Sequence, residues 1–247
     1  MLKEERQAYI IKQINLHNKV LSSDLSEKLV VSEDTIRRDL NDLADAGKIL
    51  KVHGGALSKS FHFPFRETDT YAKDAKKEIA RKALNLIKNG MLILVSGGTT
   101  MIELARMIPE KLTCTFFTVS PLVAIELAEH ANVDVILIGG ALSKNAQISV
   151  GSAVINQLID IKFDLCLLTA SSFSIKDGVT DSDWEVVQIK KTMVKASSKT
   201  AIIGIAEKLE TTQKLKVCDI SDLDYLITDL KPGDEKYAVY SEVITVV

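Results

Sequence analysis

The chain has 247 residues, of which 46% are apolar and 26% are charged, and its net charge is −2. This composition excludes disordered, collagen-like and low-complexity proteins, and the length favours two unequal domains. The longest apolar runs, such as residues 91–95, are far shorter than the ~20 residues that a membrane helix needs, and the start is too charged for a signal peptide. We therefore expect a cytoplasmic globular protein without a membrane segment.

Three cysteines, Cys114, Cys166 and Cys218, are widely spaced, and each lies within or beside an apolar run. An odd number of scattered cysteines favours neither a disulfide framework nor a zinc site. We expect small buried core residues and no bound metal.

Two hydrophobic periodicities divide the chain. Residues 1–57 follow a helical period with short breaks, whereas short apolar runs alternate with helical segments from residue 72 onward. Between them, residues 58–71 contain three Phe and one Pro among polar residues, which is typical of an extended linker that packs against a surface. We predict domains at 1–57 and 72–247, joined by a linker at 58–71.

The first 57 residues predict three helices. A buried stripe runs along the first helix and another along a short second helix over about residues 23–29. These two stripes consist of Ile10, Ile11, Ile14, Leu25 and Leu29. The third helix begins after Ser32, a good N-cap, and carries a hydrophobic staple between Val31 and Ile36. Gly47 is placed to end it.

The third helix has an apolar side and an arginine side. At 100° per residue, Arg38 points away from the apolar side, Thr35 lies near Arg38, and Arg37 projects from the flank. The apolar side consists of Ile36, Leu40 and Leu43. A short helix, a turn and a capped helix that presents Arg outward form the helix-turn-helix arrangement, whose second helix enters the major groove of DNA. Arg can donate two hydrogen bonds to guanine.

A β-hairpin is predicted after Gly47. Residues 48–57 alternate and then turn at Gly54 and Gly55, which suits a wing whose Lys48, Lys51 and His53 face the DNA backbone. The alternative is a small helical domain whose arginines only solvate a helix rich in acidic residues, because acidic neighbours weaken attraction to phosphate. Those acidic residues are Asp39, Asp42 and Asp45.

The segment VSEDTIRRDLNDLADAGKILKVHGGAL at 31–57 resembles the N-terminal signature of the DeoR family of bacterial transcriptional regulators. The resemblance includes the TIRRDL core of the third helix and the HGGA end of the wing. It implies a winged helix-turn-helix repressor that binds double-stranded operator DNA. With the wing included, the candidate DNA-contacting residues are Ser32, Thr35, Arg37, Arg38, Lys51 and His53. Because such proteins commonly read two half-sites, we expect a homodimer or tetramer assembled through the C-terminal domain.

The second part predicts a mostly parallel sheet covered by helices, because apolar runs typical of strands buried on both faces alternate with helical segments. The predicted strands are 91–95, 114–119, 133–138, 163–170, 200–206 and 224–228. The predicted helices are 72–89, 99–108, 121–131, 151–160 and 184–197.

A small-residue loop follows the first of these strands. It consists of Ser96, Gly97, Gly98, Thr99 and Thr100, so hydroxyls and free backbone N–H groups meet at a helix N-terminus, where an anion is favoured. The loop lacks the Lys of a Walker motif and the third Gly of a dinucleotide fingerprint, so neither ATP nor NAD is indicated and no cofactor is expected. The alternative is a plain turn in which Ser96 or Thr99 caps the helix.

The same loop resembles the Gly-Thr-Thr loop of the DeoR-type effector domain, and the similarity continues through 118–124, 136–142, 150–154, 177–180 and 184–197. The resemblance implies an α/β domain with the fold of ribose-5-phosphate isomerase, which binds a phosphorylated sugar or related metabolite with its phosphate on this loop. Lys144 and Lys208 stand where the family carries basic residues, and the resemblance therefore implies that both are candidate effector-binding residues. The alternative for Lys144 is a solvated loop lysine. Val119 replaces a family Asn, and Glu207 departs from the family motif around Lys208.

A rival reading is a sugar-phosphate isomerase with an accessory N-terminal domain. The signature at 31–57 and the lack of a convincing carboxylate pair beside the loop argue against it. Asp181, Asp183 and Glu185 could line a sugar pocket, but acidic residues at a helix start more often serve as caps and dipole partners. The favoured function is therefore a ligand-responsive repressor whose effector shifts the balance between DNA-competent and incompetent states.

Overall fold

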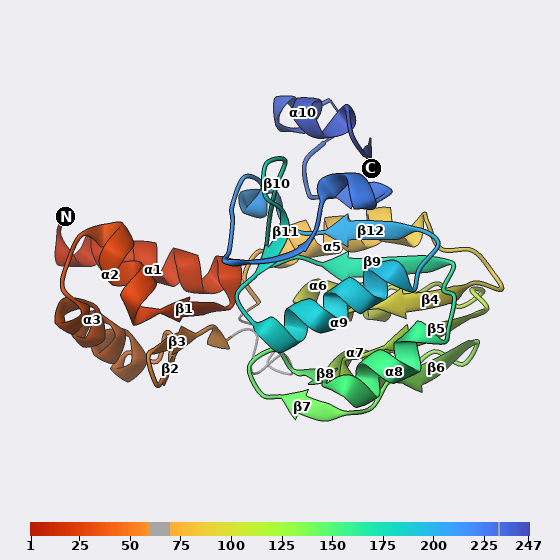
Figure 1. Cartoon of the computed structure of the whole chain (residues 1–247), viewed down its shortest axis with the longest axis horizontal. Coiled ribbons are helices and arrows are strands. Elements are labelled where there is room, and N and C mark those ends of the chain that lie inside the picture. The colour runs from red at the N-terminus through yellow and green to blue at the C-terminus, as the bar shows by residue number, and fades with distance from the viewer. Residues whose placement is uncertain (60–69, 232) are drawn as a thin grey trace. The chain divides into compact units, whose positions relative to one another are not determined.

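The computed structural model describes residues 1–59, 70–231 and 233–247. The chain divides into two compact units, Met1–Tyr71 and Ala72–Val247 (Figure 1). Most of the linker predicted at 58–71 lies outside the described residues. At its start, Ser58 is buried, and its backbone N–H donates to the carbonyl of Asn18 at 2.8 Å within the first unit.

The first unit contains three helices and a small antiparallel sheet with strand order β1-β3-β2. Its elements are α1 (Lys3–His17), β1 (Lys19–Leu21), α2 (Ser22–Leu29), α3 (Glu33–Asp45), β2 (Leu50–Val52) and β3 (Gly55–Leu57). The predicted helices and wing are confirmed. Ile11 and Leu29 are only half-buried and pack on the edge of the core. Strand β1 was not predicted, because three residues show no readable alternation.

Local chemistry fixes both ends of α3 and the base of the wing. Ser32 caps α3, since its side chain accepts a hydrogen bond from the Thr35 N–H at 3.2 Å. Gly47 follows the helix with a φ of 69°, in the left-handed region that glycine tolerates. At Gly55, a Cβ atom would lie 2.0 Å from the carbonyl oxygen of Val20. Only glycine therefore lets β3 pair with β1.

The second unit is built on a seven-stranded parallel sheet with strand order β15-β14-β12-β9-β4-β5-β6. These strands are β4 (Leu92–Val95), β5 (Cys114–Thr118), β6 (Val133–Leu137), β9 (Leu165–Thr169), β12 (Thr200–Ile203), β14 (Tyr225–Ile227) and β15 (Thr245–Val246). Six of them match the predicted strands, which confirms the α/β class. The inner strands β9 and β12 are buried on both faces, which explains their apolar sequences.

Helices cover both faces of this sheet (Figure 1). Helix α5 packs on α6 and α6 on α7, whereas α8 packs on α9. The helices are α5 (Lys73–Leu84), α6 (Thr99–Arg106), α7 (Pro121–Ala128), α8 (Ser152–Ile159), α9 (Trp184–Lys195) and α10 (Ala238–Ser241). The first five confirm the predicted helices.

Smaller elements surround the sheet and were not predicted. A hairpin pairs β7 (Ala141–Ser143) with β8 (Ile148–Val150), and a second small sheet has strand order β10-β11-β13. Its strands are β10 (Ser172–Ser174), β11 (Gly178–Asp181) and β13 (Leu215–Cys218). Short 3-10 turns lie at Ala206–Lys208, Ile220–Asp222 and Glu235–Tyr237.

The order of the parallel strands reverses beside β4. From β4 the chain continues outward through β5 and β6 on one side, whereas β9, β12, β14 and β15 follow on the other. Ligands of open α/β sheets bind at such a switch point, outside the carboxyl ends of the strands. The segments that leave β4 and β9, residues 96–100 and 170–171, meet at this position.

The predicted burial of the cysteines is confirmed. All three cysteines are free and buried. Within the described ranges, no helix is long and apolar enough to span a membrane.

Candidate functional site

The predicted DNA-contacting residues of α3 lie away from the core of the first unit. Ser32, Arg37 and Arg38 are exposed and Thr35 is half-buried. The Arg38 side chain is 79% exposed and forms an ion pair of 2.7 Å with Asp34 one helical turn earlier. An exposed pair of this kind contributes little to stability, so the guanidinium can leave Asp34 for another partner at small cost.

Two of the acidic residues of α3 are neutralised by cations from α1. Asp39 is buried, and Arg6 donates to both of its oxygens, at 2.5 Å from Nε and 3.2 Å from Nη2. Asp42 pairs with Lys3 at 2.7 Å. In the alternative interpretation, acidic neighbours offset the arginines. Asp39 and Asp42 are taken up by α1 and no longer support it, whereas Asp34 still pairs with Arg38 at 2.7 Å and with Arg37 at 3.9 Å.

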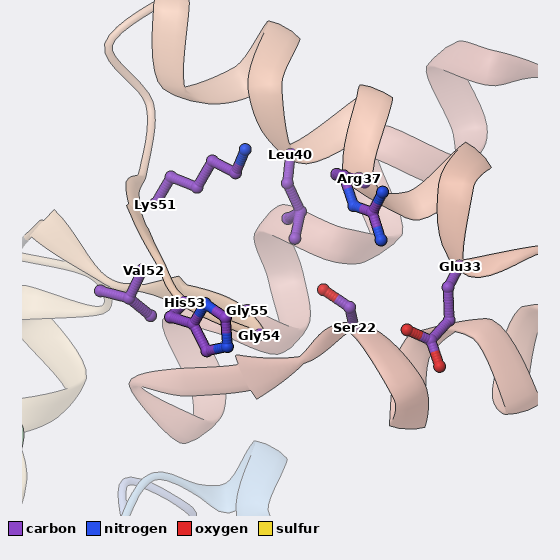
Figure 2. Close-up of a pocket in the computed structure, with 9 residues that line it drawn as sticks. All are labelled: Ser22, Glu33, Arg37, Leu40, Lys51, Val52, His53, Gly54 and Gly55. Carbon is purple, nitrogen blue, oxygen red and sulfur yellow. The ribbon is translucent and has the colours of Figure 1, made fainter.

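An open hollow of about 670 Å³ lies between α3 and the wing (Figure 2). Its lining residues are Ser22, Glu33, Arg37, Leu40, Lys51, Val52, His53, Gly54 and Gly55. Lys51 crosses from β2 to α3, where its ammonium group donates to the Asn41 side chain. Glu33 is the one carboxylate among the lining residues, and Arg37 also lies 3.9 Å from Asp34. The Arg37 and Lys51 side chains on this surface suit an anionic partner such as a DNA backbone.

The Ser96–Thr100 loop of the second unit is held by β9. Ser96 is buried, and its Oγ accepts a hydrogen bond from the Thr169 N–H at 2.9 Å. Thr169 Oγ1 in turn donates to the Gly97 carbonyl at 2.8 Å. A Cβ on Gly97 would lie 2.5 Å from Ile148 Cγ2, so glycine is needed there for packing.

Helix α6 begins at this loop without a side-chain cap. Gly98 is the N-cap residue with a φ of 109°, and no side chain accepts from the first turn. The alternative in which Ser96 or Thr99 caps the helix is therefore wrong. The first N–H groups of α6, at Thr99 and Thr100, carry the positive end of the helix dipole and suit an anion.

Lys208 reaches the same edge of the sheet. Its Nζ donates to the carbonyl of Ala170, the residue after Thr169, at 2.8 Å. Burial, together with the positive charges of Lys76 and Lys190, lowers the pKa of Lys208 to about 7, and the charge of Asp181 opposes this shift. The predicted loop and Lys208 are thus joined through two consecutive residues of one segment.

Lys76 of α5 and Lys190 of α9 are buried lysines that sequence analysis missed. Burial lowers the pKa of Lys76 to about 8, against the opposing charge of Glu103. Each lysine occupies a position of its helix's buried stripe, Lys76 with Ile79 and Ala83, and Lys190 with Val186 and Met193. A lysine in an apolar stripe is the signal that could have identified them.

Other residues singled out in the sequence lie elsewhere. Lys144 is exposed in the turn between β7 and β8, and no hydrogen bond or ion pair joins it to the loop within the described ranges. Val119 is fully buried in the apolar core, and Glu207 is exposed. Across the described part of the chain, no group of three or more His, Cys, Asp or Glu residues is arranged to hold a metal ion.

Comparison with known proteins covers both units. Residues 6–61 match the "DeoR-like helix-turn-helix domain" and residues 72–230 match the "DeoR C terminal sensor domain". The chain is 31% identical to the HTH-type transcriptional regulator GolR of Listeria innocua, covering 96% of this chain and 95% of the relative. It is 28% identical to the HTH-type transcriptional repressor GlcR of Bacillus subtilis, with 94% and 91% covered. It is 29% identical to the L-fucose operon activator of Escherichia coli, with 92% and 96% covered.

Among solved structures, ribose 5-phosphate isomerase A from Methanocaldococcus jannaschii matches with a TM-score of 0.40 and 16% identity, covering 56% of this chain and 55% of that one. The relatives that match nearly the whole chain are named transcriptional regulators, and the isomerase reading is set aside on that ground. In this chain a helix-turn-helix domain with its wing is followed by a sensor domain. The chain belongs to the DeoR family and is a DNA-binding transcriptional regulator.

Proposed function

We propose that this regulator represses genes of carbohydrate metabolism. A phosphorylated sugar bound to the second unit controls its affinity for operator DNA. One observation carries the proposal. Helix α6 has an uncapped N-terminus at the switch point of the sheet, and Lys208 lies beside it. Backbone N–H groups, hydroxyls and an ammonium group together are the donors that a phosphate needs.

In the proposed site, the phosphate accepts hydrogen bonds from the N–H groups of Thr99 and Thr100 and from their hydroxyls. Gly97 and Gly98 let the ligand approach the backbone, and Ser96 fixes the loop to β9 through Thr169. Lys208 supplies positive charge, and Lys76 adds to it from α5. Lys144 lies outside this set because it is exposed at a hairpin turn.

On the DNA side, we assign base reading to Arg38 and Thr35, on the exposed side of α3. Arg37, Lys51 and His53 line the hollow toward the wing and serve the phosphate backbone, and Ser32 fixes the helix start (Figure 2). We also propose that the chain binds its operator as a homodimer or tetramer, because a pair of recognition helices matches two half-sites. Sedimentation velocity of the full chain tests this assembly, and a monomer bound to the whole operator would contradict it.

A metabolite screen by thermal shift tests the effector assignment. A ligand at 100 times its Kd adds about 2.7 kcal/mol to the stability of the unit that binds it. Sugar phosphates are expected to raise the unfolding temperature, and the same sugars without phosphate are not. Operator binding with and without the best ligand then shows whether the effector releases or strengthens the complex. A screen in which no phosphorylated compound binds would contradict the proposal.

Replacing Arg38 should separate base reading from backbone contact. Arg38→Ala is expected to cost about 1–3 kcal/mol on the specific operator and far less on random DNA, because a bidentate contact to guanine is lost. Lys51→Ala should instead weaken all sequences alike and lower the salt slope of binding by about one. Fluorescence anisotropy at several salt concentrations measures both variants. Equal losses on both DNAs for Arg38→Ala would make it a phosphate contact.

Effector affinity should fall as pH rises from 7 to 8. Lys208 is protonated below its pKa of about 7, and a phosphate dianion favours that charged form. Above pH 7 the free protein must take up a proton on binding, so affinity drops by up to about tenfold per pH unit. The charges of Lys76, Lys190 and Asp181 also act on Lys208. Lys76 itself has a pKa of about 8, so the pH range of the experiment ends there, before Lys76 loses most of its charge.

Calorimetric titration with the screened metabolite at pH 7.0 to 8.0 measures this dependence. Lys208→Arg is the control, because Arg stays charged at every pH and should remove the fall. A wild-type affinity that is constant over this range would show that Lys208 does not titrate against the effector.

A further inference from the structure

A buried ion pair lies next to the proposed phosphate site. Asp181, the last residue of β11, accepts from Lys190 of α9 at 2.7 Å, and their side chains are only 7% and 8% exposed. Ser171 Oγ donates to the same carboxylate oxygen at 2.8 Å, and the N–H of Ser182 donates to the other at 2.7 Å. Asp181 does not cap α9, because that role belongs to Asp183. The pair therefore has no part in starting the helix.

One segment connects this pair to the phosphate loop. Thr169 bonds to Ser96 and Gly97, the carbonyl of Ala170 accepts from Lys208, and Ser171 donates to Asp181. The three residues are consecutive, so the first and the last are at most about 7 Å apart. This is about the length of a small sugar. The Asp181–Lys190 pair thus stands where the far end of a bound sugar phosphate would lie.

The charges around Lys208 set a limit on what can bind. Among the described residues, the cations here are the buried Lys76 and Lys190 and the half-buried Lys208, and the anions are the buried Glu103 and Asp181. Arg106 also faces Glu103, at 3.7 Å, but its charge is matched by Glu126 at 2.7 Å. Burial raises the pKa of Asp181, but Lys190 and the hydrogen bonds from Ser171 and Ser182 outweigh it and hold that pKa below its usual value. Asp181 therefore stays negative. With Lys208 protonated, the group carries one net positive charge, which a single phosphate already exceeds.

We propose that Asp181 is a specificity-determining residue that admits effectors with one phosphate and an uncharged far end, and that it excludes bisphosphates and phosphorylated sugar acids. The inference rests on the phosphate site proposed at α6. Lys190 has three N–H donors and uses one on Asp181, so it can donate to a hydroxyl or carbonyl oxygen of the sugar. A second anionic group would meet the Asp181 carboxylate in a buried place, where like charges repel strongly.

Matched ligand pairs that differ in one charged group test this selectivity. Suitable probes are fructose 6-phosphate against fructose 1,6-bisphosphate, and glycerol 3-phosphate against 3-phosphoglycerate, with inorganic phosphate as a common reference. The sequence contains one tryptophan, Trp184, at the start of the helix that carries Lys190, so its fluorescence reports binding. The wild-type chain is expected to prefer the member of each pair that has one anionic group.

Asp181→Asn should reduce this preference by at least about 50-fold, because Coulomb's law at an effective dielectric constant of 20 gives that factor for two unit charges as far as ~7 Å apart. The matched control is Asp183→Asn, which removes a nearby carboxylate but keeps a good helix cap. It should leave the preference unchanged.

The outcomes separate the two proposals. Wild-type protein that binds both members of each pair equally overturns the role of Asp181 even if Asp181→Asn fails to fold. If Asp181→Asn binds monophosphates with the same preference as the wild type, the role of Asp181 is overturned as well. The proposed phosphate site would still stand. If neither the monophosphates nor inorganic phosphate bind wild-type protein, both proposals fall.

Discussion

Gly98→Asp should abolish the response to effector while operator binding persists. Gly98 is the N-cap of α6 with a φ of 109°, and the nearest atom to a Cβ built there is Thr169 Oγ1 at 3.6 Å. An aspartate side chain therefore has room, but it places a carboxylate where the phosphate is proposed to bind. Repulsion between like charges in this concavity should weaken effector binding by ~100-fold or more. Operator binding by anisotropy, with and without the screened metabolite, measures the change.

Two further variants control for backbone strain. A non-glycine residue at a strained, positive φ costs of the order of 1–3 kcal/mol, which Gly98→Ala introduces without the charge. Gly90→Asp places the same residue at a φ of 81° with nothing within 4 Å, in the turn before β4. Both controls should respond to effector. If Gly98→Asp keeps its full response, the phosphate lies elsewhere, and Lys208 and Lys144 are the next positions to test; if it loses DNA binding outright, the loop is only structural.

Arg6→Met should destabilise the DNA-binding unit by about 3–5 kcal/mol. The Arg6 and Asp39 side chains are 12% and 2% exposed. Removal of the cation leaves a buried carboxylate whose one remaining side-chain donor among the described residues is Gln7, at 3.3 Å. Because two domains need not unfold together, the stability of the first unit has to be measured separately from that of the second. Hydrogen exchange of the α1 and α3 amides in the full chain does this. Operator affinity should fall with it, since α3 loses its packing on α1.

The matched control for this variant is Lys3→Met. Lys3 comes from the same helix and pairs with Asp42 of α3, but the two side chains are 61% and 48% exposed. Exposed ion pairs contribute about 0–1 kcal/mol, so exchange in α1 and α3 should change little. Equal destabilisation by both substitutions would mean that the Arg6–Asp39 pair has no special role.

Features that depend on neighbours in the sequence could be predicted without a structure. The start of α3 at Ser32 and its end before Gly47 follow from capping chemistry within a few residues. The inner strands could be recognised because a strand covered on both faces is apolar throughout. Three-residue strands such as β1 and β10 have too few residues to show a period, so only pairing in the folded chain reveals them.

The proposal of an anion site at Ser96–Thr100 could be made from the sequence, because its donors are consecutive in the chain. The sequence could not predict whether the acidic residues of α3 are paired. Asp39 is paired with Arg6, which reaches it from another helix. The buried lysines are a second case. Lys76 and Lys190 lie on separate helices, far apart in the sequence from each other and from the loop.

By itself the sequence determined the family, the two kinds of domain and the local signals that begin and end their helices. Only the tertiary structure decided which charges meet, and therefore which pKa values shift. The physical reason is the range of each effect: a cap or an apolar stripe acts over one or two helical turns, whereas desolvation and Coulomb interactions depend on every group brought close in space. The Asp181–Lys190 pair beside Lys208 exists only because β9, β11 and α9 converge at the carboxyl edge of the sheet.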